Sequence, residues 1–147
     1  MKTDTTANAP GLLIVLIFTM LLLSSCSFGP PTLENLSSAD YGSPISQQDA
    51  EAQAQQFLRR YLKDPDSASY EWNPVYRGWM REAPIHGGGL KFGYILDGNI
   101  NAKNSFGGYT GLKPYKFVFY NGNIVSVYAQ QELRGSYRST YYMGKIY

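Results

Sequence analysis

Few side chains in this sequence are suited to covalent chemistry. The 147 residues include one histidine, His86, and one cysteine, Cys26. His86 opens a His-Gly-Gly-Gly string like the one that forms part of the oxyanion hole in some lipases, but the chain has no Gly-x-Ser-x-Gly motif to supply a nucleophile. We therefore expect a glycine-rich loop between two strands. One histidine and one cysteine also provide no nitrogen and sulfur ligand set, so neither a metal nor a cofactor is predicted.

Carboxylates are the remaining candidates for acid–base chemistry. A glycosidase places two of them across a cleft. The residues available for such a pair are Glu71, Glu82, Asp97 and Glu132. Because nothing in their spacing selects one pair, the sequence predicts a protein that is not an enzyme.

Polar and aromatic side chains gather in residues 101–111, NAKNSFGGYTG. Glycines and asparagines can form a nest of backbone donors for an anion. A phosphate-binding loop, however, ends in Gly-Lys-Ser/Thr and opens a helix, whereas this stretch leads through Pro114 into a predicted strand. We expect a long connection or bulged hairpin that Phe106 and Tyr109 pin to the sheet. The residues predicted to contact a partner there are Lys103, Asn104, Phe106 and Tyr109.

Cys26 follows an uncharged apolar run, residues 11–23. The run is shorter than the roughly 20 apolar residues that span a bilayer as a helix, and it fits the core of a signal peptide. A thiol is also the most nucleophilic group available for alkylation. The sequence therefore predicts a processed N-terminus with a modified cysteine.

The four residues Leu23, Ser24, Ser25 and Cys26 resemble the lipobox of bacterial lipoproteins: a branched apolar residue, two small residues and a cysteine. The resemblance implies that the Cys26 thiol receives a diacylglyceryl group, that a peptidase cuts before it, and that the new amine is often acylated. At about 0.8 kcal/mol per buried methylene, two or three chains make a lasting membrane anchor. In such lipoproteins, an aspartate directly after the cysteine favours retention at the inner membrane. Residue 27 is serine, so the resemblance implies sorting to the outer membrane. The modified chain has no thiol left for a disulfide.

Composition and charge predict how the rest of the chain is organised into segments. A net charge of +2 is too small to predict nucleic-acid binding, although the residues from Ile100 onward are clearly basic. Residues 27–45 are rich in Pro, Ser and Gly, which is typical of a flexible tether. The predicted organisation is a signal peptide at 1–25, a lipidated cysteine and tether at 26–45, and a small domain at 46–131. Residues 132–147 are tyrosine-rich and form either an edge strand or a tail.

The predicted domain begins with an amphipathic helix. Ser46 suits the N-cap, with Asp49 three residues later, and Pro65 ends the helix. Its apolar face comprises Ala50, Ala54, Phe57, Leu58, Tyr61 and Leu62. Strands are expected at residues 69–80 (broken at Pro74), 90–102, 115–120 and 124–130, and Asn121-Gly122 predicts a tight hairpin turn. The predicted fold is α+β, with one N-terminal helix packed on an antiparallel sheet of three or four strands.

Two stretches also resemble a recurrent domain of small bacterial and phage-associated proteins, many of them predicted lipoproteins, that has no assigned activity. They are LKDPDSASY, residues 62–70, and NAKNSFGGYTG, residues 101–111. The resemblance covers about residues 47–128, and it implies a domain identity without a mechanism.

These observations predict a lipid-anchored protein of the outer membrane whose domain faces the periplasm and binds another envelope protein. The partner would be a component of an envelope assembly or a cell-wall enzyme that the domain inhibits. The alternative is a lipoprotein that binds peptidoglycan or another glycan, with exposed tyrosines and Trp72 or Trp79 stacking on sugar rings.

Overall fold

The computed structural model describes residues 29–134 and 139–147. The chain divides into two compact units, Met1–Thr32 and Leu33–Tyr147, and every element below belongs to the second. Cys26 and the predicted signal peptide lie outside the described residues. In the part of the chain that is described, no helix has both the length and the apolar character needed to cross a bilayer.

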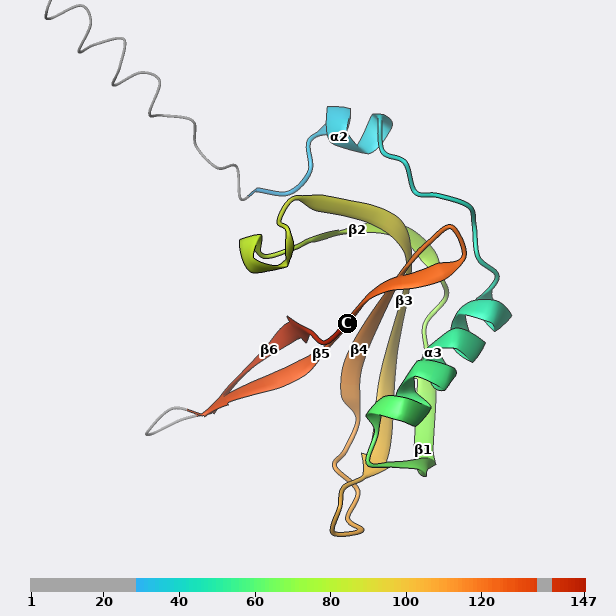
Figure 1. The fold of residues 1–147 in the computed structure, drawn as a ribbon, viewed down its shortest axis with the longest axis vertical. Helices are drawn as coiled ribbons and strands as arrows, with labels where there is room; N and C mark the ends of the chain where they lie inside the picture. Colours follow the sequence, from blue (N-terminus) through green and yellow to red (C-terminus); the bar gives the residue numbers. More distant parts are fainter. Residues whose placement is uncertain (1–28, 135–138) are drawn as a thin grey trace, which may run out of the picture. The chain divides into compact units, whose positions relative to one another are not determined.

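Six antiparallel strands form one sheet, in the order β1-β3-β4-β5-β6, and β2 also pairs with β3 (Figure 1). The strands are β1 Asp64–Trp72, β2 Tyr76–Arg81, β3 Leu90–Lys103, β4 Lys113–Tyr120, β5 Asn123–Arg134 and β6 Ser139–Lys145. The helical elements are α2 Leu33–Ser37, α3 Gln47–Tyr61 and the 3-10 turn η1 Pro84–His86. The long strand β3 pairs with β2 along its first half and with β1 along its second half.

The α+β prediction is wrong, because the fold is predominantly β and has six strands where three or four were expected. The sequence predicts one interrupted strand over residues 69–80, but the chain turns near Pro74 and makes two strands, β1 and β2, that both pair with β3. The tyrosine-rich end supplies a further strand, β6, at the opposite edge of the sheet. Nor is α3 the first helix, since α2 precedes it.

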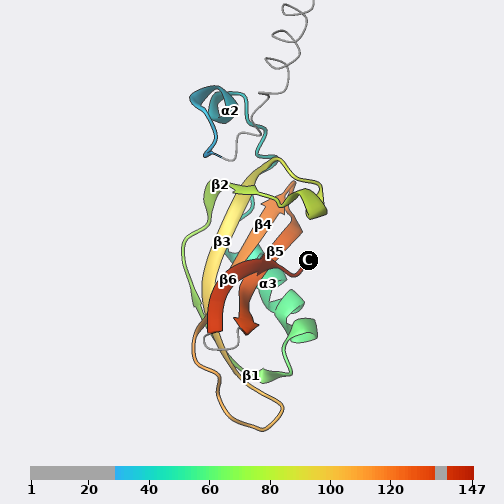
Figure 2. The ribbon, with the colours of Figure 1, turned by 90° about the vertical axis from the view of Figure 1, so that its left-hand side faces the viewer.

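Helix α3 packs on one face of the sheet, and Figure 2 turns the other face to the viewer. Ser46 caps it as predicted: its Oγ accepts a hydrogen bond from the Asp49 N–H at 3.1 Å. Ala50, Ala54 and Leu58 are buried against the sheet, where the small alanines allow the helix to approach closely. The helix ends at Tyr61, before Pro65, which lies within the edge strand β1.

The core lies between α3 and the strands β3, β4 and β5. Its buried sheet residues are Leu96, Ile100, Tyr115, Phe117, Phe119, Val127 and Ala129. On β3, Gly98 is needed for close packing, because a Cβ there would lie 2.3 Å from Cε3 of Trp72. Trp72 stacks on Tyr70, with ring centroids 5.5 Å apart, and also contacts Phe117. Trp72 is therefore a partly buried residue that packs against the core.

The turn between β4 and β5 confirms the hairpin prediction. Asn121 and Gly122 both adopt positive φ, 49° and 74°, as a type I′ turn requires. The register shifts between Val118 and Phe119, which is a bulge close to the turn.

Much of the predicted tether is structured. It includes α2, and beyond that helix the chain contacts the sheet: the Tyr120 hydroxyl donates to Asp40 Oδ2 at 2.5 Å, and the Ser43 N–H donates to Asn121 Oδ1 at 2.9 Å. The Tyr41 ring packs edge-on against Phe92. At the other end of the chain, Tyr147 packs against Phe57 of α3.

Candidate functional site

The connection between β3 and β4, residues 104–112, is an ordered loop built around one asparagine. We call it the aromatic loop. Oδ1 of Asn104 accepts hydrogen bonds from the N–H groups of Phe106, at 2.9 Å, and Gly108, at 3.1 Å. The Asn104 N–H donates to the Gly108 carbonyl, and the Gly107 N–H donates to the Asn104 carbonyl. These four bonds fix the tip, and the positive φ of Gly107, 80°, permits the turn.

The base of the loop is held by β3. Lys103 and Tyr109 form an isolated antiparallel bridge, and Thr110 donates its N–H to the Ala102 carbonyl at 3.2 Å. Lys103 Nζ lies 5.4 Å from the centre of the Tyr109 ring, within the range of a cation–π contact. The structure thus brings all four predicted contact residues together, with Asn104 in a structural role.

Phe106 stands at the tip of this loop with 97% of its surface exposed. The expectation that Phe106 pins the loop to the sheet is therefore wrong: Asn104 fixes the tip, and the contacts of Tyr109 and Thr110 with β3 hold the base. Tyr109 and Leu112 are also largely exposed, at 59% and 50%. An ordered loop that presents apolar side chains to solvent is a candidate contact surface.

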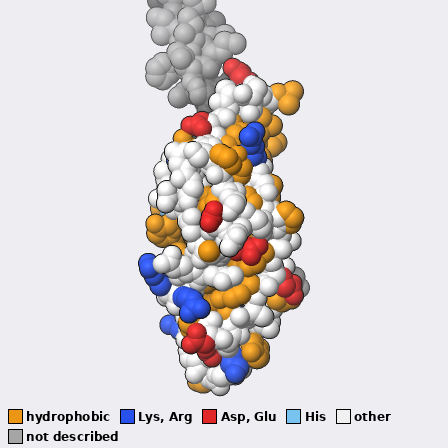
Figure 3. Space-filling view, turned by 90° about the vertical axis from the view of Figure 1, so that its right-hand side faces the viewer, with side chains coloured by type: hydrophobic (Ala, Val, Ile, Leu, Met, Phe, Trp, Pro, Cys, Tyr) orange, Lys and Arg blue, Asp and Glu red, His pale blue; other side chains and the backbone are white. Residues whose placement is uncertain are grey.

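Basic residues surround the loop. Lys63, Lys103 and Lys113 line a cavity of about 480 Å³ beside it. No carboxylate of the described residues lies within ion-pairing distance of these three lysines. Figure 3 shows Lys and Arg side chains in the lower part of the face that it views, interspersed with hydrophobic and acidic side chains.

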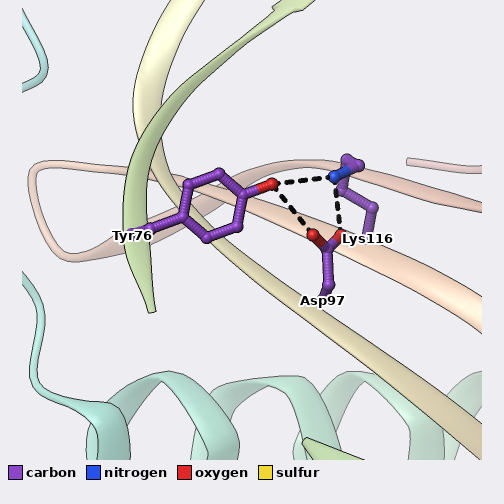
Figure 4. Close-up of polar contacts among 3 residues, drawn as sticks. All are labelled: Tyr76, Asp97 and Lys116. Carbon is purple, nitrogen blue, oxygen red and sulfur yellow. Dashed lines mark hydrogen bonds and ion pairs between the residues drawn. The ribbon is translucent and has the colours of Figure 1, made fainter. Parts of the chain in front are cut away.

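A second polar group lies on the face of the sheet opposite α3. The Tyr76 hydroxyl donates to Asp97 Oδ2 at 2.9 Å, and Lys116 Nζ lies 2.6 Å from Asp97 Oδ1 and 3.1 Å from the Tyr76 oxygen (Figure 4). Burial alone would lower the pKa of Lys116, but its hydrogen bonds to Asp97 and Tyr76 outweigh burial and raise it. The three side chains come from β2, β3 and β4, so the group ties these strands together.

A third group contains the most buried charge of the described residues. The Glu82 side chain is 4% exposed, and its Oε1 accepts hydrogen bonds from Lys145 Nζ at 2.5 Å and Ser126 Oγ at 3.2 Å. Burial would raise the pKa of Glu82, but the hydrogen bonds from Lys145 and Ser126 and the positive charge of Lys145 lower it. The group links the end of β2 to β6, the far edge of the sheet, and lines a cavity of about 630 Å³ with Phe92 and Val125.

The carboxylates considered for a glycosidase do not converge. Asp97 pairs with Lys116, Glu82 pairs with Lys145, and Glu132 accepts a hydrogen bond from Ser139 on β6. His86 lies in η1, and the three glycines after it, which all have positive φ, connect β2 to β3 as predicted. Across residues 29–134 and 139–147, no cluster of three or more metal-ligating side chains is found.

Sequence reasoning missed the Glu82–Lys145 pair and the contribution of Lys63 and Leu112 to the surface around the loop. Glu82 and Lys145 are 63 positions apart, so no local pattern joins them. Lys63 lies in the first resembling motif and Leu112 directly follows the second, and only the packing of the end of α3 beside the loop brings them to one surface. Comparison with known proteins finds no matching family model, no matching curated protein and no matching solved structure.

Proposed function

We propose that this chain is a lipid-anchored protein of the bacterial outer membrane whose domain faces the periplasm and binds another envelope protein through the aromatic loop, without catalysing a reaction. The observation that carries the proposal is Phe106, which is almost fully exposed at the tip of a hydrogen-bonded loop. Exposing an aromatic ring to water is unfavourable, and a partner's surface would remove that cost.

The order of the loop supports a binding role. A flexible loop loses conformational entropy when a partner fixes it, whereas the Asn104 bonds have already fixed this one. The backbone around Phe106 can therefore enter an interface without rearranging. Aromatic residues are enriched among the few side chains that carry most of the energy of an interface.

The proposed lipid anchor explains the sequence pattern near the N-terminus. Leu23-Ser24-Ser25-Cys26 supports lipidation at Cys26, with residues 1–25 removed. Membrane attachment confines a protein to a surface and raises its local concentration there. A loop of modest affinity can then hold a partner that lies in the same membrane or beside it.

The test is affinity purification of the full chain from the envelope fraction of the cells that make it, with Phe106→Ala and Tyr109→Ala variants. Ile85 is the matched control, because it is a large apolar residue with 86% exposure, on η1 rather than on the loop. We expect partner proteins to be depleted about tenfold or more with Phe106→Ala and to be unchanged with Ile85→Ala. Equal recovery with a folded Phe106→Ala variant would contradict the proposal.

Glycan binding is a second candidate function, and the structure makes one of the two tryptophans named for it less accessible. Trp72 is partly buried, with its ring stacked on Tyr70 and in edge contact with Phe117, while Trp79 on β2 is 36% exposed. Sedimentation of the purified protein with isolated cell-wall sacculi separates the two candidates. Cosedimentation at low salt that is lost with Trp79→Ala but kept with Phe106→Ala would favour the glycan.

A further inference from the structure

Strand β5 stays paired with β6 beyond the point where its pairing with β4 stops. The pairing between them ends at Tyr115 and Ala129, whereas β5 remains paired with β6 as far as Arg134 and Ser139. Among the described strands, none pairs with residues 130–134 on the β4 side. This part of β5 is therefore an open sheet edge on one side.

The backbone groups at this edge can be assigned from the register. The Val127 carbonyl accepts from the Ile146 N–H at 2.8 Å, and its N–H donates to the Tyr147 carbonyl, so both groups face the β6 side. The β5–β6 register is regular from Tyr128 to Arg134. Because backbone groups alternate along an antiparallel strand, those of Gln130, Glu132 and Arg134 face the open side.

The open edge borders a groove. Two cavities, of about 480 Å³ and about 360 Å³, share Thr110, Lys113 and Gln130 as lining residues. The smaller one is also lined by Leu112 of the aromatic loop and Tyr141 of β6, which are both exposed. An extended chain laid along the edge would therefore contact apolar side chains on two sides.

The charge of the groove favours an acidic occupant. Lys63, Lys103 and Lys113 line the two cavities, and the only carboxylate lining them is Glu132. Glu132 already accepts a hydrogen bond from Ser139 at 2.6 Å and lies 3.4 Å from the Arg134 guanidinium. Lys113 also adds positive charge near Glu132, and Lys103 lies over the Tyr109 ring, but no carboxylate of the described residues is within ion-pairing distance of the three lysines. A carboxylate on the ligand would supply that ion pair.

We propose that an extended acidic segment of the partner protein binds here by strand addition, pairing with residues 130–134 of β5 on the side where its pairing with β4 has ended. This inference rests on the proposed function and specifies its mode of recognition. Five paired residues extend about 17 Å, which is enough for a short peptide. Main-chain hydrogen bonds supply affinity in this mode, and the pockets beside the edge supply specificity.

The test uses defined probes on the full chain in detergent micelles. The first probe is a capped eight-residue peptide that alternates valine and glutamate, the second alternates valine and lysine, and the third is the first with alternate amides N-methylated to block pairing. We expect the glutamate peptide to bind about tenfold or more tightly than either control. It should also slow hydrogen exchange at the amides of Glu132 and Arg134, which face the open side.

Two variants at one position isolate the backbone contribution. Glu132→Pro removes the N–H that faces the groove and no N–H that faces β6, whereas Glu132→Gln keeps that N–H and removes the negative charge. We expect Glu132→Gln to bind the glutamate peptide at least as well as the wild type, and Glu132→Pro to bind it about tenfold more weakly. If folded Glu132→Pro and Glu132→Gln bind the glutamate peptide equally well, the inference is overturned. It is also overturned if the N-methylated peptide binds as tightly as the unmethylated one.

The remaining outcomes separate this inference from the proposed function. If the glutamate peptide does not bind, while Phe106→Ala still releases partner proteins, strand addition is excluded and the binding role of the loop stands. If the free chain is dimeric in sedimentation and the Glu132 and Arg134 amides are already protected, a second copy occupies the edge and the inference is overturned.

Discussion

At the scale of single residues, the Glu82–Lys145 pair is the most buried ion pair of the described residues. Glu82 is nearly inaccessible to water, and among the described residues only Lys145 forms an ion pair with its carboxylate. A buried pair of this kind adds little net stability compared with apolar residues, but losing one partner leaves an unpaired charge in the interior.

We predict that Lys145→Met lowers the free energy of unfolding by about 3 kcal/mol or more, because Glu82 is then buried without its cation. Urea unfolding measures the change. Arg134→Met is the control: Arg134 pairs with Glu132 at 3.4 Å on the surface, so we expect a loss of less than about 1 kcal/mol. A Glu82→Gln, Lys145→Met double variant should regain part of the loss. Equal, small effects of the two single variants would show that the buried pair is not important for folding.

Tyr115 gives a prediction at alkaline pH. Burial raises the pKa of its hydroxyl from 10.0 to about 12, so the folded chain keeps a proton that the unfolded chain releases. The stability from this group is complete below pH 10 and is lost as pH rises through 12. With one pKa unit equal to about 1.4 kcal/mol, Tyr115→Phe should remove on the order of 2 kcal/mol of the wild-type decline between those values. Parallel pH profiles of urea unfolding for the two proteins would contradict this.

At the scale of elements, the close approach of β3 to β4 depends on a glycine. A Cβ at Gly93 would lie 2.3 Å from the Phe119 carbonyl oxygen, which backbone pairing holds in place. Gly108 is also a glycine, but a Cβ there would meet only the Asn104 side chain, at 3.8 Å. An added Cβ would therefore clash with the backbone at position 93 but not at position 108.

We therefore predict that Gly93→Ala lowers the free energy of unfolding by about 2 kcal/mol or more, while Gly108→Ala changes it by no more than about 0.5 kcal/mol. Thermal or urea unfolding followed by circular dichroism measures both. If Gly93→Ala is as stable as Gly108→Ala, the pairing of β3 with β4 described above is incorrect.

Some of these helices, turns and strands could be predicted from the sequence, and others could not. Helix α3 and the Asn121-Gly122 turn were predictable, because each depends on residues within a few positions: the Ser46 cap and the positive φ of the turn. The fold class was not, because strands β1 and β2 form only when both meet β3, and β6 forms only against β5. Local patterns carry no information on such long-range pairing.

The candidate site was predictable to a similar degree. Its four residues lie within seven positions in one motif, and the structure places them together on the aromatic loop. The sequence did not reveal that Asn104 fixes the loop and so frees Phe106, since that depends on side-chain geometry. The open edge of β5 was equally hidden, because it depends on where the pairing of β5 with β4 stops, at Tyr115 and Ala129.

At the scale of the whole molecule, the proposal joins an anchored N-terminus to a β-rich domain with an exposed loop. We predict that Cys26→Ser accumulates as a precursor that keeps residues 1–25 and carries no acyl chain, because the thiol is the atom that would be alkylated. Intact mass analysis of the protein from the membrane fraction measures both changes. Ser24→Ala, which keeps a small residue in the lipobox, is the control and should mature normally. Normal maturation of Cys26→Ser would remove the anchor from the account.

The most direct test of the central claim is site-specific photo-crosslinking in the cells that make the protein, with a photoreactive phenylalanine analogue at position 106. The same analogue at position 85 is the control, since Ile85 is similarly exposed but lies outside the loop. We predict a discrete crosslinked adduct with one envelope protein from position 106, lost when Asn104→Ala releases the loop tip, and no such adduct from position 85. Identical adducts from the two positions, or none from position 106, would contradict a binding role for the aromatic loop.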